Sequence, residues 1–184
     1  MSGGFTCLGS MRSGYDGKGR TRAVPSSHAT LIAIGDVVTE TGTADALGNP
    51  QVDVATASTI VSGVVVGIVP DYSTEALSDI KILASTAGTV IINEDPDAEY
   101  EVDVENGPLV VADVGLNANL VANAATTAGG LTRSNMTLNA TGKATTATLQ
   151  FRIVRLVTGS DGVLGSRAVV RVNKSTNNTG ATGI

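Results

Sequence analysis

The feature that most constrains the fold is a strict alternation of acidic and apolar side chains near the middle of the chain. It runs in the order Glu99, Tyr100, Glu101, Val102, Asp103, Val104 and Glu105. Successive side chains of a β-strand point to opposite faces, so this pattern predicts a half-buried strand. We expect its three apolar residues in the core and its four acids on a face that meets solvent or a partner.

Other segments carry the same kind of signal. Residues 60–69 form a dense apolar run with two glycines, which predicts a central strand buried on both faces. Residues 167–172 alternate, and so do residues 148–158, where Gln150 is expected on the face opposite the apolar residues. The alternation slips at residues 153–155, which indicates a β-bulge.

The composition also favours strands. The hydrophobic residues are chiefly Val, Ala, Ile and Leu, aromatic residues make up only 3%, and Thr and Gly are plentiful. Residues 112–145 are rich in Ala, Asn, Thr and Gly and are expected to form long ordered loops. Because no long helical segment separates the strands and no repeat is evident, we predict an all-β fold, an antiparallel β-sandwich or barrel with long loops.

Charge and glycine content divide the chain into three parts. Residues 1–25 are glycine-rich and hold four cations against one carboxylate, a net charge of +3, so the other residues carry −8 of the total of −5. This segment is predicted to be a flexible basic N-terminal arm that lies on a neighbouring chain. Residues 26–174 are expected to form the β-rich domain, and residues 175–184 a polar tail that frays.

The same numbers bear on the class of partner and on the cellular location. A net charge of −5 disfavours binding to a nucleic-acid backbone. No apolar stretch approaches the roughly 20 residues that cross a bilayer, and the N-terminal residues lack the pattern of a secretory signal. Cys7 is the only cysteine, so an intrachain disulfide is excluded. We expect synthesis in a cytoplasm-like compartment, with neither nucleic acid nor membrane as partner.

Candidate catalytic and metal-binding residues are few. His28 is the only histidine and no Gly-x-Ser-x-Gly elbow accompanies it, so a surface histidine is favoured over a catalytic one. Cys7, in its glycine-rich segment, is interpreted as an inert thiol. One Cys and one His cannot supply a structural zinc site, and alternating acids spread along a strand rather than converge on calcium. The sequence therefore predicts neither an enzyme nor a cofactor.

The charged residues are better candidates for contacts with partner proteins. We expect the arm to bind through its four cations, which are Arg12, Lys18, Arg20 and Arg22. On two strands predicted to be neighbours lie four further arginines, Arg152, Arg155, Arg167 and Arg171. Arginine suits planar pairing with carboxylates, so we expect at least two of these four to meet acidic groups of a neighbouring chain. The alternative, that they are ordinary surface charges, is equally compatible with the sequence.

Three segments resemble the capsid decoration (cement) proteins of tailed bacteriophages. They are residues 61–71, residues 90–120 and residues 146–157, and the most distinctive part is Asp-Pro-Asp-Ala-Glu-Tyr-Glu-Val at residues 95–102. The resemblance covers roughly residues 55–172 and leaves out the arm. It implies a virion protein made in the host cytoplasm, which sits on the outer capsid surface and bridges subunits of the major capsid protein. It also implies association with copies of itself, as a homotrimer.

Two other functions remain open at this point. One is a different virion component, such as a head-fibre or tail protein. The other is a carbohydrate-binding adhesive β domain, which would need exposed aromatic rings to stack against sugars. The chain offers only two Phe and three Tyr for that purpose. A hydrolase ranks below both alternatives.

Overall fold

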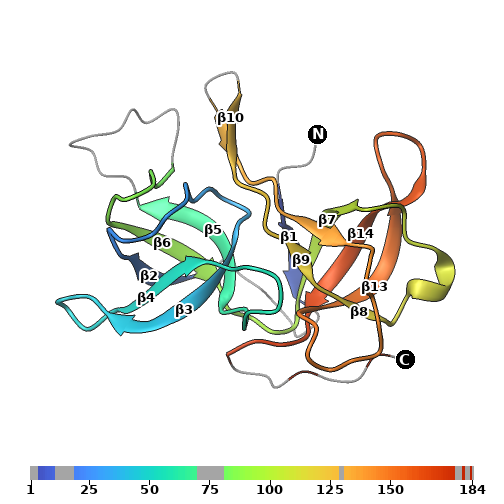
Figure 1. Ribbon diagram of the computed structural model, residues 1–184, viewed down its shortest axis with the longest axis horizontal. Coiled ribbons are helices and arrows are strands. Elements are labelled where there is room, and N and C mark those ends of the chain that lie inside the picture. The colour runs from blue at the N-terminus through green and yellow to red at the C-terminus, as the bar shows by residue number, and fades with distance from the viewer. Residues whose placement is uncertain are drawn as a thin grey trace.

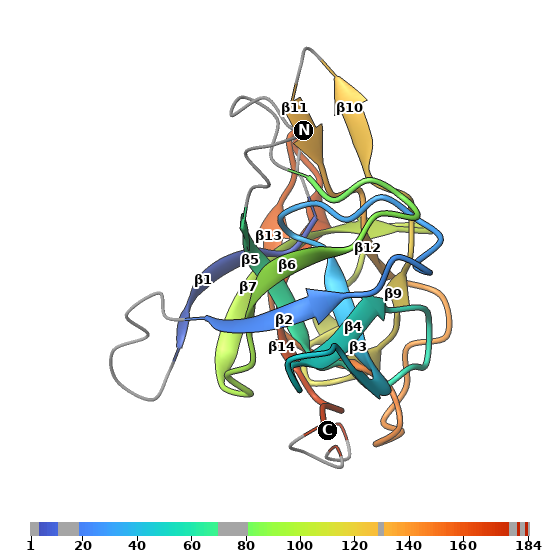
Figure 2. The same cartoon turned by 90° about the vertical axis from the view of Figure 1, so that its left-hand side faces the viewer.

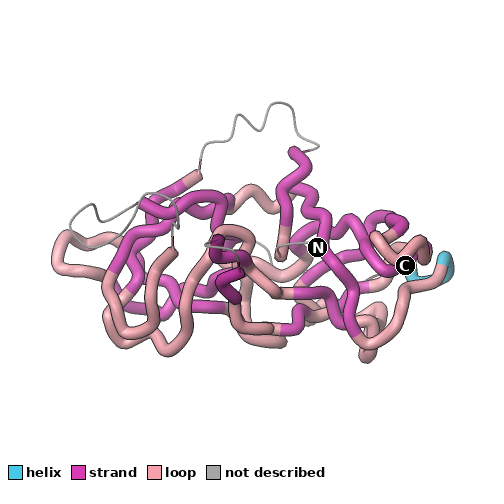
Figure 3. Tube along the Cα trace, turned by 90° about the horizontal axis from the view of Figure 1, so that it is seen from above, coloured by secondary structure: helices cyan, strands magenta, loops and turns pink. Residues whose placement is uncertain are grey.

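The structure is a computed structural model, and it describes residues 4–10, 19–69, 81–128, 131–176, 180 and 183. Within these residues the chain is all-β, as predicted, apart from one 3-10 helical turn, η1 (Val111–Asp113). Figure 1 shows a small barrel beside a larger sheet, and Figure 3 shows the same arrangement from above.

The barrel is built from five strands that close on one another in the order β2-β4-β3-β5-β6. They are β2 (Arg20–Val24), β3 (Val37–Ala44), β4 (Pro50–Val54), β5 (Gly63–Val69) and β6 (Gly88–Asn93). Small β-branched side chains such as Val38, Val65 and Ile92 fill its interior. The apolar run at residues 60–69 supplies β5, which pairs with both β3 and β6 and is therefore central, as predicted. Its two end residues, Ile60 and Val69, are nevertheless half exposed.

The larger sheet has the order β8-β13-β14-β7-β12-β9, and β1 also pairs with β7. Its strands are β1 (Thr6–Ser10), β7 (Ala98–Glu105), β8 (Asn117–Ala118), β9 (Leu120–Val121), β12 (Thr137–Asn139), β13 (Phe151–Thr158) and β14 (Leu164–Val172). A separate hairpin of β10 (Thr126–Ala128) and β11 (Leu131–Arg133) projects from the body, as both side views show (Figures 1 and 2). Residues 112–145, predicted to be loops, thus contain five short strands. The prediction of loops was wrong because the hydroxyl and methyl side chains of these residues fit strand edges as well as loops.

The alternation at residues 99–105 gives the predicted half-buried strand, β7. Tyr100 and Val102 are fully buried, and Val104 packs against the same core while partly exposed. The four acids lie on the opposite face and are partly exposed. Period-two alternation therefore assigned each face of this strand correctly.

The slip of alternation in β13 is a β-bulge, as predicted. Ile153 pairs with Val170 of the antiparallel strand β14. The neighbouring residue of β14, Val169, pairs with Arg155 and not with Val154. The extra residue, Val154, restores the phase of the strand, so that Arg152 and Arg155 share the outer face although they are three positions apart. Gln150, predicted on that outer face, is instead completely buried, because it precedes β13 and turns into the junction with the barrel.

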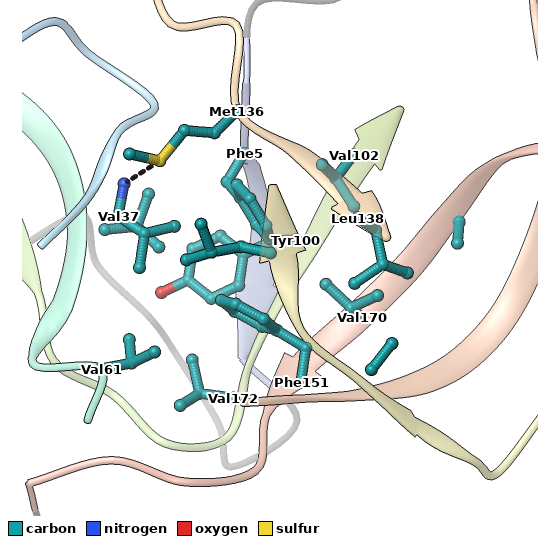
Figure 4. Packing of buried hydrophobic residues seen from close by; sticks show 14 of the residues in the cluster. Phe5, Val37, Val61, Tyr100, Val102, Met136, Leu138, Phe151, Val170 and Val172 are labelled. Carbon is teal, nitrogen blue, oxygen red and sulfur yellow. Dashed lines mark hydrogen bonds between the residues drawn. The ribbon is translucent and has the colours of Figure 1, made fainter. Parts of the chain in front are cut away.

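A cluster of aromatic rings fills the core of the larger sheet (Figure 4). Phe5 stacks on Phe151 with ring centroids 4.7 Å apart, and meets the edge of Tyr100 at 6.4 Å. Val37 and Val61 from the barrel side pack into the same cluster. This cluster therefore joins the larger sheet to the barrel, whose interior forms a second apolar cluster.

Two buried polar side chains fasten this junction. Gln150 donates from Nε2 to the carbonyl oxygens of Thr56 (2.9 Å) and Thr59 (3.0 Å), and its Oε1 accepts from the amide of Leu120 at 3.0 Å. All three links are to backbone groups, and the bond from the Leu120 amide is buried, so Oε1 pairs a donor that would otherwise be buried without a partner.

The second buried polar side chain at this junction is Asp36, which is almost completely buried. Its Oδ2 accepts from the amide of Ala33 at 2.8 Å. Burial raises the pKa of this carboxyl to about 6, against the smaller lowering effects of hydrogen bonding by Ser134 and Ala33. Desolvation favours the neutral acid over the carboxylate, which explains the direction.

Residues 4–10 and 19–25, the described part of the predicted flexible arm, contact their own domain and not a neighbouring chain. β1 pairs with β7 and β2 pairs with β6, both within the same chain, and Phe5 is buried in the core. The physical reason is that the edges of β7 and β6 offer backbone partners and the core offers a site for the Phe5 ring, which composition alone does not reveal. The described residues of the tail are also anchored, since Thr176 donates to the carbonyl of Val61 and Gly183 to that of Thr145.

Candidate interaction surface

The outer face of the larger sheet gathers most of the charged residues singled out from the sequence. The strand registers place Glu99 beside Arg171 and Arg171 beside Arg152 in one row across three strands. The next row is Glu101, Val169 and Arg155, and the third is Asp103, Arg167 and Val157. The face is consequently acidic along β7 and basic towards β13.

Two of the four arginines have carboxylate partners within the chain. Arg167 lies 2.7 Å through Nη1 from Glu101 and 3.0 Å through Nε from Asp103. Arg171 lies 3.7 Å from Asp97. We expected partners from a neighbouring chain for at least two of the four arginines; these two are paired inside the fold, because β14 lies directly beside the acidic strand.

The other two arginines lie at the edge of the sheet. Arg155 is exposed and Arg152 partly exposed, and among the described residues neither makes an ion pair. The acid at the far end of β7, Glu105, has a structural role instead. Its Oε2 accepts from Asn123 at 2.7 Å and from Thr137 at 2.8 Å, which ties the ends of β9 and β12 to β7.

The cations of the predicted arm fall into two groups. Arg12 and Lys18 lie outside the described residues. Arg22 forms a largely buried ion pair with Glu94, and Arg20 lies 3.5 Å from the same carboxylate. These pairs join β2 to the segment that follows β6, so both arginines contact their own domain.

His28 is buried, contrary to the expected surface position. Its Nδ1 lies 2.7 Å from the carbonyl oxygen of Thr30 and its Nε2 2.9 Å from that of Thr86. Backbone carbonyls at both ring nitrogens give the side chain a structural role, fastening two loops at one end of the barrel. Cys7 is partly buried and accepts a weak contact from Asn93 at 3.5 Å. Among the described residues no group of three or more His, Cys, Asp or Glu converges as metal ligands would.

A polar pocket of about 360 Å³ lies where β7 ends beside the turn between β13 and β14. Asp103, Arg167, Asp161 and Ser166 contribute polar groups to its wall. Asp161 accepts from the hydroxyl of Ser166 at 2.6 Å, and this bond, followed by one from the amide of Val163, holds the pKa of the Asp161 carboxyl below its usual value. Arg167 also pairs with Glu101 and Asp103. The charged side chains in the wall of the pocket are therefore already bonded to other side chains of the protein.

Exposed apolar side chains lie in two segments beside this sheet, one that follows β7 and one that leads into β14. Val111 is the first residue of η1 and is 74% exposed; Val110 and Val114 flank η1 and are 58% and 38% exposed. Val163 and Leu164, in the turn that leads into β14, are about half exposed. Gly165 accepts from the amide of Leu109, which brings the two segments together. Sequence patterns did not single out these residues, because short apolar runs in loops look like core.

No protein-family model, curated protein or solved structure matches this chain. No helix among the residues that the structure describes is long and apolar enough to cross a bilayer.

Proposed function

We propose that this chain is a structural virion protein that binds the outer surface of an assembled bacteriophage capsid and stabilises it by bridging neighbouring subunits. The observation that carries the proposal is the larger sheet. The two longer segments that resemble decoration proteins supply β7 and β13, on either side of β14. The sheet combines an acidic half and a basic half, and exposed apolar residues lie beside it, which together suit the binding of protein surfaces.

The proposed mechanism needs no chemistry beyond binding. A protein that binds only the assembled lattice stabilises that lattice by mass action. Contacts with two or more subunits from each copy add the gain of multivalency. In this proposal the major capsid protein is the partner, neighbouring copies associate as a homotrimer, and the location is the outer capsid surface.

The burial of the three described aromatic residues favours this function over a carbohydrate-binding domain. Phe5, Tyr100 and Phe151 are the aromatic residues within the described part of the chain, and all three are buried in the core. A sugar site ordinarily needs an exposed ring, and these three are fully used in packing.

The test is binding to shells of the major capsid protein from the same phage. Purified protein is mixed with assembled shells or with unassembled subunits, and co-sedimentation and the melting temperature of the shells are measured. We expect saturable binding to shells, a raised melting temperature, and little binding to free subunits. Absence of binding to shells, or equal binding to free subunits, would contradict the proposal.

A further inference from the structure

The outer edge of β13 is only partly paired. At its start, Phe151 and Arg152 pair with β8, and Ile153 exchanges two backbone hydrogen bonds of 2.9 Å with Gly115 and Leu116. Beyond the bulge, among the described residues, 154–158 make backbone hydrogen bonds to β14 alone. A free edge of this kind is a template for one more strand.

The side chains at this edge indicate the charge of such a strand. Arg155 lies on the free part of the edge and Arg152 at its start, and both lack an ion pair within the described residues. In contrast, Arg167, one strand further in, is held by two carboxylates of β7. The sheet thus already pairs an acidic strand with an arginine strand, and β13 presents arginines that have no carboxylate partner among the residues that the structure describes.

Apolar side chains lie at the point where the edge becomes free. Val114 directly precedes Gly115, which donates to Ile153, and η1 with Val111 comes just before it. At the other end of the edge, Thr158 pairs with Leu164, which is 52% exposed. An added strand would therefore find backbone partners along its length and apolar contacts at both ends.

The arginines also argue against a second copy of β13 as the occupant. Pairing two such edges would bring the arginines of both copies close together, and like charges on facing strands are destabilising. A strand with carboxylates would gain from the same arrangement.

We propose that residues 154–158 of β13 bind an extended, carboxylate-bearing segment of a partner protein by strand addition, with Arg152 and Arg155 pairing with its acids and Val111 and Val114 packing on its apolar side chains. The chemistry of the segment follows from this edge alone. Its assignment to a capsid subunit rests on the proposed function.

The experiment uses the full chain and a fluorescent peptide with the sequence of residues 98–105, the acidic strand that pairs with the arginines of β14. Fluorescence anisotropy at low salt should give saturable binding, and replacing the acids of the peptide by amides should weaken it about tenfold or more. The double variant Arg152→Glu/Arg155→Glu should weaken it by at least as much, and Val111→Asp by a smaller factor. Arg133→Glu, which changes an equally exposed arginine on the projecting hairpin, should leave affinity within about twofold.

Amide NMR shifts locate the bound peptide, and a thermal melt confirms that each variant is folded. We expect the shifts to concentrate in residues 110–116 and 153–158. Failure of the peptide to bind, equal loss in the Arg133→Glu control, or shifts centred on β1 and β12 would overturn the inference. If the edge variants lose the peptide but still decorate capsid shells, the assignment of this edge to the capsid contact is wrong while the proposed function stands. If the edge binds the peptide but the protein does not bind capsid shells, the strand-addition site stands and the proposed function is wrong.

Discussion

The buried carboxyl of Asp36 makes the stability of the protein depend on pH in an unusual direction. Its pKa is raised from 3.8 to about 6 in the folded state, chiefly by burial. A tenfold change in proton affinity is worth about 1.4 kcal/mol, so the rise corresponds to about 3 kcal/mol. The folded state holds this proton more tightly than the unfolded state, so the contribution is fully present below pH 3.8 and is lost as the pH rises through 6.

We therefore expect the difference in unfolding free energy between the native protein and Asp36→Asn to change by about 2 kcal/mol between pH 4 and pH 7.5, the rest of the effect lying below pH 4. The native protein should become more stable relative to the variant as the pH falls. Urea unfolding at a series of pH values measures both proteins, and subtracting the two curves removes the titration of all other carboxyls. Asparagine retains an oxygen for the amide of Ala33, which keeps the local turn comparable.

Asp45→Asn provides a matched control. Hydrogen bonds from Asn49 hold the pKa of the Asp45 carboxyl below its usual value, and the group is fully exposed. Its difference curve should be nearly flat between pH 7.5 and pH 4 and of opposite sign, with stability lost only as the pH falls below 3.8 through the lowered pKa. A flat difference curve for Asp36→Asn over the same range would refute the reasoning, because it would mean that the carboxyl is solvated in the folded protein.

Three further predictions concern packing, and each is checked by urea unfolding at pH 7. Phe5→Ala should cost about 3–5 kcal/mol because the ring is buried in the aromatic cluster, and a cost below about 1 kcal/mol would place the residue outside the core. Gln150→Leu should cost about 1–3 kcal/mol because it leaves the buried amide of Leu120 without its acceptor and removes two further hydrogen bonds, and a neutral result would mean that water replaces the amide. Gly165→Ala should cost more than about 2 kcal/mol, because φ is +90° and the new Cβ would overlap the carbonyl of Leu109. The control, Gly142→Ala, has a φ of +81° and open space around the new Cβ, and should cost about 1 kcal/mol. Equal costs for the two variants would contradict the overlap.

The sequence predicts those parts of the fold whose signal is local. Alternation identified both faces of β7, and a slip in alternation located the bulge in β13. Each of these signals depends only on which side of a pleated strand a residue occupies. The same rule failed at Gln150, where the strand had not yet begun and tertiary contacts decided the orientation.

The candidate site was predicted less completely because its properties depend on strand order. The sequence singled out Arg155 and Arg167 alike, but only the registers distinguish a paired arginine beside β7 from one at the edge that makes no ion pair with another described residue. The N-terminal segment was misplaced for the same reason, since glycine content predicts flexibility while the β-edges that accept β1 and β2 come from residues about 70–90 positions later. The exposed valines around η1 carried no sequence signal.

The pairing of β2 with β6 has a consequence for the order of folding. The barrel is formed by one continuous stretch, residues 20–93, whereas the larger sheet joins β1 to strands made much later. Because Arg20 pairs with Ile92, closure of the barrel brings the two ends of that stretch together. The segments that become β1 and β7 then emerge side by side, and their pairing no longer requires closing a loop of about 90 residues. During synthesis the barrel is expected to act as the template, with the sheet completed only when β13 and β14 leave the ribosome.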